Sequence, residues 1–126
     1  MNRVELTDRL RKLGLGTEDH WLIMGGAMVL YGLRAETGDI DLGCTRRLAD
    51  ELEEKGYPVI TMPDGSRKIC LADDVEIFEE WLYDKVEMVE GIPVISLNGL
   101  IAMKRSLGRE KDMRDIARIE AFQARN

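Results

Sequence analysis

The stretch Trp21-Leu-Ile-Met-Gly25-Gly26-Ala27, followed by Asp39-Ile40-Asp41-Leu42, decides the fold of this chain. The four apolar residues 21–24 suit a buried strand, and the glycine pair separates them from residues 27–33, which are spaced like an amphipathic helix. Glycine has no β-carbon, so an anion can approach the backbone closely at the pair, where the amides of the helix start would face it. The stretch therefore predicts a phosphate cradle between a strand and a helix.

Two carboxylates follow on the next short strand. Asp39 and Asp41 alternate with Ile40 and Leu42, so both acids project from one face with β-carbons about 6 to 7 Å apart, while the apolar residues point into the core. The acids repel each other, and a hard cation such as Mg²⁺ or Mn²⁺ converts that repulsion into a binding site that also retains substrate phosphates. A soluble edge strand is the alternative for an isolated Asp-x-Asp, and the upstream glycines favour the metal site.

The order and spacing of these residues resemble a known family. The string Gly25-Gly26-x-x-x-x-x-Gly32-x-Arg34-x-x-Thr37-x-Asp39-Ile40-Asp41-Leu42 is similar to the signature of the nucleotidyltransferase superfamily with the polymerase-β-like fold. Within it, the likeness is to small bacterial stand-alone members, including the nucleotidyltransferase-like toxins of abortive-infection systems. The segment from Ile95 to Asp112 is similar to the helical motif that closes this fold.

The resemblance implies a metal-dependent enzyme that moves a nucleoside monophosphate from a nucleoside triphosphate to a hydroxyl acceptor and releases pyrophosphate. Asp39 and Asp41 would bind the metal that carries the phosphates, in a two-metal in-line displacement. Glu76 would be the third acid, hold the second metal and accept the hydroxyl proton. Asp74 shares a face with Glu76, and either reaches the metals. The apolar residues that flank Glu76 favour it, although the family more often has aspartate here.

Four polar residues and the two glycines are candidates for binding the nucleotide. Arg34 lies between the expected helix and the acidic strand, where its guanidinium can hold two phosphate oxygens or simply end a helix. Thr37 can bind a phosphate or cap the turn before the strand. Lys104 lies at the border of an apolar helix stripe, from which it reaches a cleft or stays a solvated flank. Lys111, with Asp112, can orient the nucleotide or form a loop salt bridge.

The chain order predicts a single minimal nucleotidyltransferase-like domain over residues 1–126, with an α/β (α+β) fold, a mixed sheet, helices packed on it and two C-terminal helices. Helices are expected at 4–13, at 27–33, at 45–55 with Thr45 as its cap, and along 97–107 with Gly108 as its stop. A last helix begins near Lys111 and packs through Met113, Ile116, Ala117 and residues 119–122. Short strands are expected at 59–61, 67–71, 75–78, 86–89 and 93–95, with a hairpin turn at 63–65.

Composition limits the classes of function. The net charge of −6 disfavours a protein that grips long nucleic acid through its whole surface. No apolar run has the length of a membrane span and the N-terminal segment has no signal-peptide core, so no membrane contact and a cytoplasmic location are expected. One histidine and two cysteines are too few for a histidine triad or a zinc site.

The identity of the acceptor stays open between a small molecule, a protein and an RNA end. A site completed by a second subunit, in a homo-oligomer, is also compatible with so short a chain. Two other functions remain as alternatives to nucleotidyl transfer. The first is a non-catalytic partner in a toxin–antitoxin-like pair, and the second is a metal-dependent phosphohydrolase.

Overall fold

A seven-stranded mixed sheet organises the chain, with the strand order β3-β4-β5-β2-β1-β7-β6. The computed structural model describes residues 1–125, and residue 126, the last of the expected domain, lies outside that range. Along the chain the elements are α1 (Arg3–Leu13), β1 (His20–Ile23), α2 (Met24–Leu30), β2 (Ile40–Cys44), α3 (Arg46–Glu54), β3 (Val59–Thr61), β4 (Arg67–Ala72), β5 (Val75–Glu79), β6 (Val86–Val89), β7 (Ile92–Ile95), α4 (Leu97–Leu107) and α5 (Glu110–Arg125). This confirms the expected mixed sheet with C-terminal helices.

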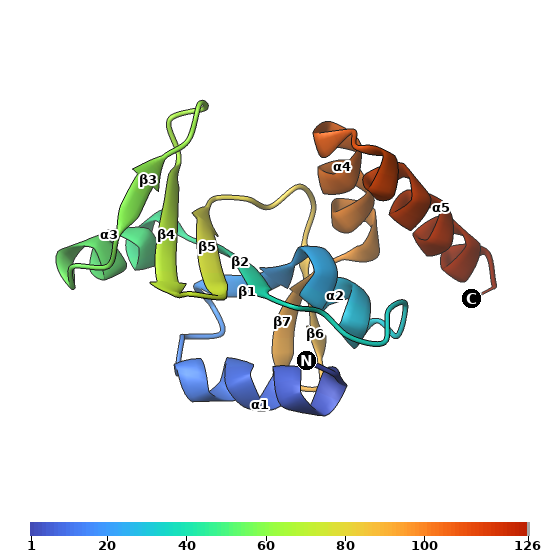
Figure 1. Ribbon diagram of the computed structural model, residues 1–126, viewed down its shortest axis with the longest axis horizontal. Helices are drawn as coiled ribbons and strands as arrows, with labels where there is room; N and C mark the ends of the chain where they lie inside the picture. Colours follow the sequence, from blue (N-terminus) through green and yellow to red (C-terminus); the bar gives the residue numbers. More distant parts are fainter. Residues whose placement is uncertain (126) are drawn as a thin grey trace.

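The centre of the sheet is formed by β2, which runs antiparallel to β1 and parallel to β5. Every residue of β1 is buried. In β2, Asp41 is partly exposed and the other four residues are buried. Helix α2 contacts both strands, α1 packs on α2, and α4 and α5 pack on each other beside the sheet (Figure 1). Because β2 and β5 are parallel neighbours, polar residues at the start of each strand come to the same edge of the sheet.

Local sequence signals set most helix ends. Thr45 caps α3 by accepting a hydrogen bond from the amide of Leu48, as expected. Ser96 caps α4 in the same way, and Gly108 ends that helix with a left-handed backbone, φ 65°, a conformation that glycine adopts without a steric cost. These ends fix where the two C-terminal helices meet.

Helix α2 differs from the prediction. It begins at Met24 rather than near Ala27, so Gly25 and Gly26 lie in its first turn instead of in a loop before it. Met24 has φ 58°, which is uncommon for a side chain of its size. This positive φ turns the chain directly from strand to helix, and apolar periodicity carries no sign of it.

The buried face of α5 also differs from the prediction. Met113 is 48% exposed and Ala117 is exposed, whereas Asp112 and Asp115 are buried in line with Ile116 and Ile119. Two acids therefore lie on the packed face of the helix, which requires charged partners nearby. Within residues 1–125, no helix has both the length and the apolar character needed to cross a membrane.

Candidate functional site

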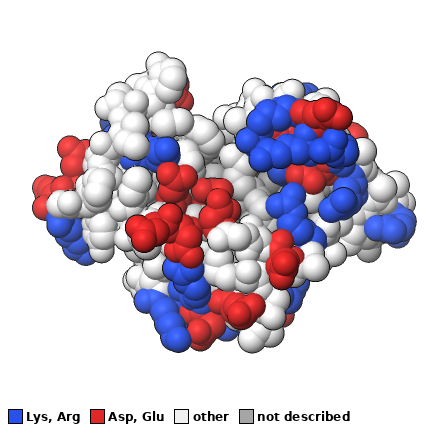
Figure 2. Space-filling model, in the orientation of Figure 1, with Lys and Arg blue, Asp and Glu red and all other residues white. Residues whose placement is uncertain are grey.

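Three carboxylates line one wall of a cavity of about 330 Å³. Asp39 precedes β2, Asp41 lies on β2, and Glu76 lies on β5 directly opposite Asp41 in the parallel register. Cross-strand neighbours project from the same face of a sheet, so the register explains why these acids meet. Figure 2 shows acidic side chains gathered beside a hollow, with a group of basic side chains over α4 and α5 on its other side.

The acids of this wall interact electrically. Burial, together with the charges of Asp39 and Glu76, raises the pKa of Asp41 to about 6, and the charge of Lys68 opposes this shift. The pKa of a carboxyl rises in this way when negative charges near it lack full compensation. A cation bound at this wall would therefore lower the electrostatic free energy of the folded protein.

The third acid is bound to a lysine. Lys68 Nζ on β4 lies 3.2 Å from Glu76 Oε2. Among the described residues, no three histidine, cysteine, aspartate or glutamate side chains converge closely enough to hold a metal ion as they stand. Asp39, Asp41 and Glu76 thus share a wall without forming a closed cage. Their oxygens suit a hard divalent cation by chemistry and charge. Asp39 and Asp41 form no ion pair with any residue from 1 to 125, whereas Glu76 pairs with Lys68.

Asp74, the alternative third acid, faces a different partner. The Arg9 guanidinium forms a bidentate contact with its carboxylate, with Nη2 to Oδ1 at 2.9 Å. This hydrogen bonding lowers the pKa of Asp74. Glu76 lines the cavity and, among residues 1–125, Asp74 is not part of that lining. Of the two acids, Glu76 is the one at the cavity, and its role as the third acid stays a prediction.

The opposite wall is built on a buried ion-pair network. Lys104 on α4 is 3% exposed, and its Nζ lies 3.0 Å from Asp115 Oδ2 and 3.8 Å from Asp112 Oδ1, both on α5. Arg34 Nη2 reaches the same Asp115 oxygen at 3.0 Å. Neither sequence interpretation of Lys104 describes it fully, because the lysine is buried and paired while it lines the cavity. Arg34, too, has a structural partner that its sequence context did not show.

The rim of this wall carries two more cations. Arg109 Nε lies 2.6 Å from Asp112 Oδ2, and the hydrogen bonds from Arg109 lower the pKa of Asp112. Lys111 is exposed, lines the cavity and forms no ion pair with any residue between 1 and 125. The loop salt bridge anticipated at this point therefore involves Asp112 and Arg109, and the Lys111 ammonium is available to a ligand.

The two glycines have different surroundings. A β-carbon at Gly25 would lie 2.7 Å from Arg34 Nη1 and 2.8 Å from Thr37 Oγ1, so its hydrogen makes room for polar groups of the cavity. A β-carbon at Gly26 would instead lie 2.7 Å from Leu22 Cδ1. Gly26 is buried, and the space that its absent side chain leaves is filled by core packing. Its part in phosphate binding stays a prediction.

Thr37 is a cap and a cavity residue together. It is 8% exposed, and its Oγ1 donates to the carbonyl of Asp39 at 3.3 Å. The Met1 ammonium donates to the Thr37 carbonyl at 2.6 Å, and the Thr37 amide donates to the Met1 carbonyl. These contacts fix the turn that presents Asp39.

Sequence reasoning missed three charged residues beside the cavity: Lys68, Arg109 and Asp115. Asp112 and Asp115 are three residues apart and in phase with Ile116, and this spacing places both acids on one face of a helix. Lys68 lies on a strand that the predicted hairpin sets next to residues 75–78. The helical spacing of the two acids and the hairpin position of Lys68 are both visible in the sequence. Neither shows a role until the tertiary partner is known.

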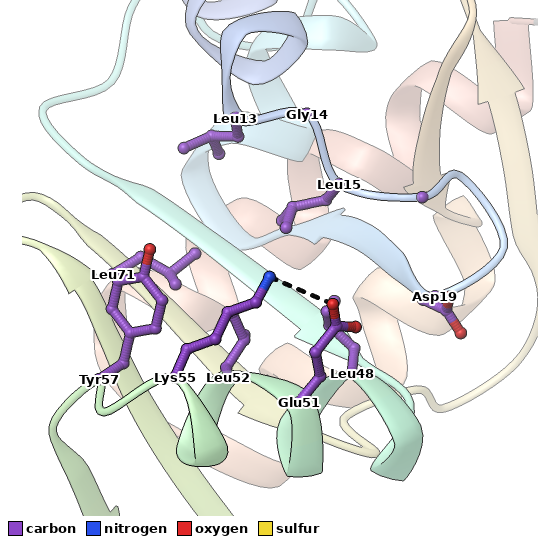
Figure 3. Close-up of a pocket in the computed structure, with 11 residues that line it drawn as sticks. Leu13, Gly14, Leu15, Asp19, Leu48, Glu51, Leu52, Lys55, Tyr57 and Leu71 are labelled. Carbon is purple, nitrogen blue, oxygen red and sulfur yellow. Dashed lines mark ion pairs between the residues drawn. The ribbon is translucent and has the colours of Figure 1, made fainter.

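A second cavity, of about 230 Å³, lies between the end of α1 and helix α3 (Figure 3). Leucines from both segments line it, and on the α3 side Lys55 pairs with Glu51, with Nζ and Oε1 at 3.2 Å. The cavity holds no set of acids or cations like that of the first. Among the described residues, the charged groups of interest concentrate at the cavity beside β2 and β5.

Comparison with known proteins supports the fold. No protein-family model and no curated protein matches the chain. A structure from Thermotoga maritima, described as that of a candidate nucleotidyltransferase, superposes with a TM-score of 0.63 at 20% sequence identity, over 93% of each chain. At this identity the likeness concerns architecture. The chain therefore has the α+β fold of a nucleotidyltransferase-like protein, a mixed sheet closed by C-terminal helices.

Proposed function

We propose that this protein is a Mg²⁺- or Mn²⁺-dependent nucleotidyltransferase that transfers a nucleoside monophosphate to a hydroxyl acceptor. One observation carries the proposal: a single cavity has Asp39, Asp41 and Glu76 on one wall and four cations on the other. A metal-bound triphosphate has the matching pattern, since its cation suits carboxylates and its phosphate oxygens suit lysine and arginine. The shared fold with a candidate nucleotidyltransferase supports this choice.

In this proposal Asp39 and Asp41 hold the metal. A bound divalent ion would supply Lewis-acid polarisation of the phosphoryl group. Lys111 and Arg109, at the exposed rim, bind phosphate oxygens first, and Arg34 and Lys104 hold them deeper in the cavity. Asp115 keeps Arg34 and Lys104 in place before substrate arrives, which lowers the entropic cost of binding.

Glu76 has the remaining chemical role. The acceptor oxygen attacks the α-phosphorus, its proton passes to the Glu76 carboxylate directly or through one water, and the bond to the bridging oxygen breaks. Pyrophosphate leaves with the electron pair of that bond. Glu76 lies on the wall next to Asp41, where an acceptor hydroxyl beside the α-phosphate would be within reach.

The test is transfer of a label from the α-phosphate. Each nucleoside triphosphate, labelled there, is incubated with the protein, Mg²⁺ and three acceptor sets: small hydroxyl compounds, RNA with free ends, and proteins, including this protein itself. The proposal predicts a labelled acceptor and free pyrophosphate, and no labelling with the Asp39→Asn/Asp41→Asn variant. Release of orthophosphate in place of pyrophosphate would indicate the phosphohydrolase instead.

A second candidate function is a non-catalytic partner in a toxin–antitoxin-like pair. The observation that favours it is a set of exposed apolar side chains at and before the edge strand β6, namely Leu82, Tyr83 and Met88. An unpaired edge with apolar side chains is a surface that a second chain, of this or another protein, can cover. This candidate predicts an unchanged biological effect when Asp39 and Asp41 are replaced, whereas the enzyme loses its effect.

A further inference from the structure

Lys68 contacts the acidic wall but has no role in the chemistry above. It lies on β4, opposite Phe78 in the antiparallel register with β5, two pairs away from the pair of Cys70 and Glu76. Phe78 and Glu76 both line the cavity, and cross-strand partners share a face, so Lys68 approaches from the cavity side. Its Nζ lies 3.2 Å from Glu76 Oε2, and its side chain is 24% exposed.

Most other charged side chains near the cavity already have an ion-pair partner, Lys111 on the opposite rim excepted. Asp74 pairs with Arg9, Asp112 with Arg109, and Asp115 with Lys104 and Arg34. Among the described residues, Lys68 is the one basic side chain that forms an ion pair with any of the three acids of this wall, and its partner is Glu76. The three carboxylates and the one ammonium have a net charge of −2, which one divalent cation neutralises.

The ammonium of Lys68 already occupies the position beside Glu76 where a second divalent ion would bind. Such an ion would have to bind Glu76 beside the ammonium of Lys68, so two cations would share one carboxylate at contact distance and repel each other strongly. Lysine suits such a place, because its ammonium is a compact point charge with no demand for a fixed coordination geometry. The failure of the three acids to converge into a cage agrees with a Glu76 that is held by lysine.

We propose that the ammonium of Lys68 stands in the place of the second metal, so that the site binds one divalent ion per chain, at Asp39 and Asp41. This inference rests on the proposed function, because it concerns the same metal site. Glu76 then acts as a proton acceptor tethered by Lys68 and is not a metal ligand. The reaction is assisted by one metal and one lysine.

The experiment counts bound metal and needs no activity. Mn²⁺ is titrated into the folded protein, with and without a non-hydrolysable nucleoside triphosphate analogue, and free Mn²⁺ is followed by electron paramagnetic resonance. The wild type should bind one Mn²⁺ at the acidic wall. Lys68→Met should gain a second Mn²⁺ with affinity raised roughly tenfold or more over any second ion in the wild type, because one competing positive charge is gone. Lys68→Arg, which keeps the charge, should bind one.

Lys85→Met is the matched control, because Lys85 is an exposed lysine that pairs with Glu87 away from the cavity; it should behave as the wild type does. Two Mn²⁺ in the wild type, or one in a folded Lys68→Met, would overturn the role of Lys68 and leave the proposed function standing. No Mn²⁺ in the wild type, even with the analogue, would overturn the proposed function itself. If Lys68→Met does not fold, the numbers of Mn²⁺ bound by the wild type and by Lys68→Arg still test the role of Lys68.

Discussion

Lys104 on α4 donates a hydrogen bond from Nζ to Asp115 Oδ2 on α5 at 3.0 Å, and both side chains are almost fully buried. The pair joins the two C-terminal helices at the floor of the cavity. It also connects them to Arg34, which shares the same carboxylate oxygen. Under the proposed function, stability and nucleotide binding therefore depend on the same aspartate.

Replacing Asp115 should destabilise the protein. Asp115→Asn removes the charge that balances a buried lysine, and loss of one partner of a buried ion pair costs about 3 kcal/mol or more. Urea unfolding of the variant should show this loss. Glu110→Gln, which breaks an exposed pair with Arg114 on the same helix, is the control and should leave the free energy of unfolding nearly unchanged. Equal stability of Asp115→Asn and wild type would contradict the network described here.

Replacing Asp41 should have the opposite effect at neutral pH. Its pKa is raised from 3.8 to about 6 in the folded protein, so the folded state binds more protons than the unfolded state between these values, and stability falls as pH rises through that window. Asp41→Asn removes the cost of ionising this buried carboxyl in the folded protein. It should raise the free energy of unfolding by about 2 kcal/mol at pH 7.5 in metal-free buffer, with a gap that closes near pH 4. The exposed Glu54→Gln is the control. A stability difference between Asp41→Asn and wild type that does not change with pH would refute the raised pKa of Asp41, which burial and the neighbouring charges cause.

A methyl group at Gly25 should disturb the cavity. The β-carbon of Gly25→Ala would displace the Arg34 guanidinium and the Thr37 hydroxyl, which lie 2.7 and 2.8 Å from its position. We expect nucleoside triphosphate affinity to fall about tenfold, the loss of roughly one charge-assisted hydrogen bond. Gly38→Ala places its methyl in open space and should bind as the wild type does. Calorimetry of both variants decides, and equal affinities would place the phosphates elsewhere.

The two acids around β5 should behave differently when neutralised. Asp74→Asn loses a contact with Arg9, outside the cavity lining, and should leave nucleotide binding and turnover unchanged. Glu76→Gln keeps its shape but cannot accept a proton, so turnover should fall at least about a hundredfold. Transfer of the α-phosphate label measures both. A large loss in Asp74→Asn with normal turnover in Glu76→Gln would exchange their roles.

Most of the fold was predictable because its signals are local. Thr45, the 63–65 turn and Gly108 each act through neighbours in sequence, and the apolar runs of β1 and β7 suit buried strands. The start of α2 was missed because it depends on the positive φ of Met24. The spacing of apolar residues does not indicate that one residue has a left-handed backbone conformation.

The site was predictable to the extent that its residues lie on adjacent elements. Asp39, Asp41 and Glu76 come together through strand register, which alternation and chain order indicate. Lys104 was a candidate and does line the cavity. Its burial and ion pair were not predictable, because its partner Asp115 lies on a different helix, eleven residues on. Burial of a lysine depends on such a tertiary partner, and apolar periodicity favoured Met113 and Ala117 for the face that in fact holds acids.

The central claim is that the two walls of one cavity bind a metal-bound triphosphate. The most direct measurement is calorimetric titration of each nucleoside triphosphate into the protein with Mg²⁺ at pH 7.5, above the pKa of about 6 of Asp41. We predict binding of at least one triphosphate that requires the metal and disappears in a folded Asp39→Asn/Asp41→Asn variant. Absence of binding to the folded wild type, or equal binding to the double variant, would contradict the claim.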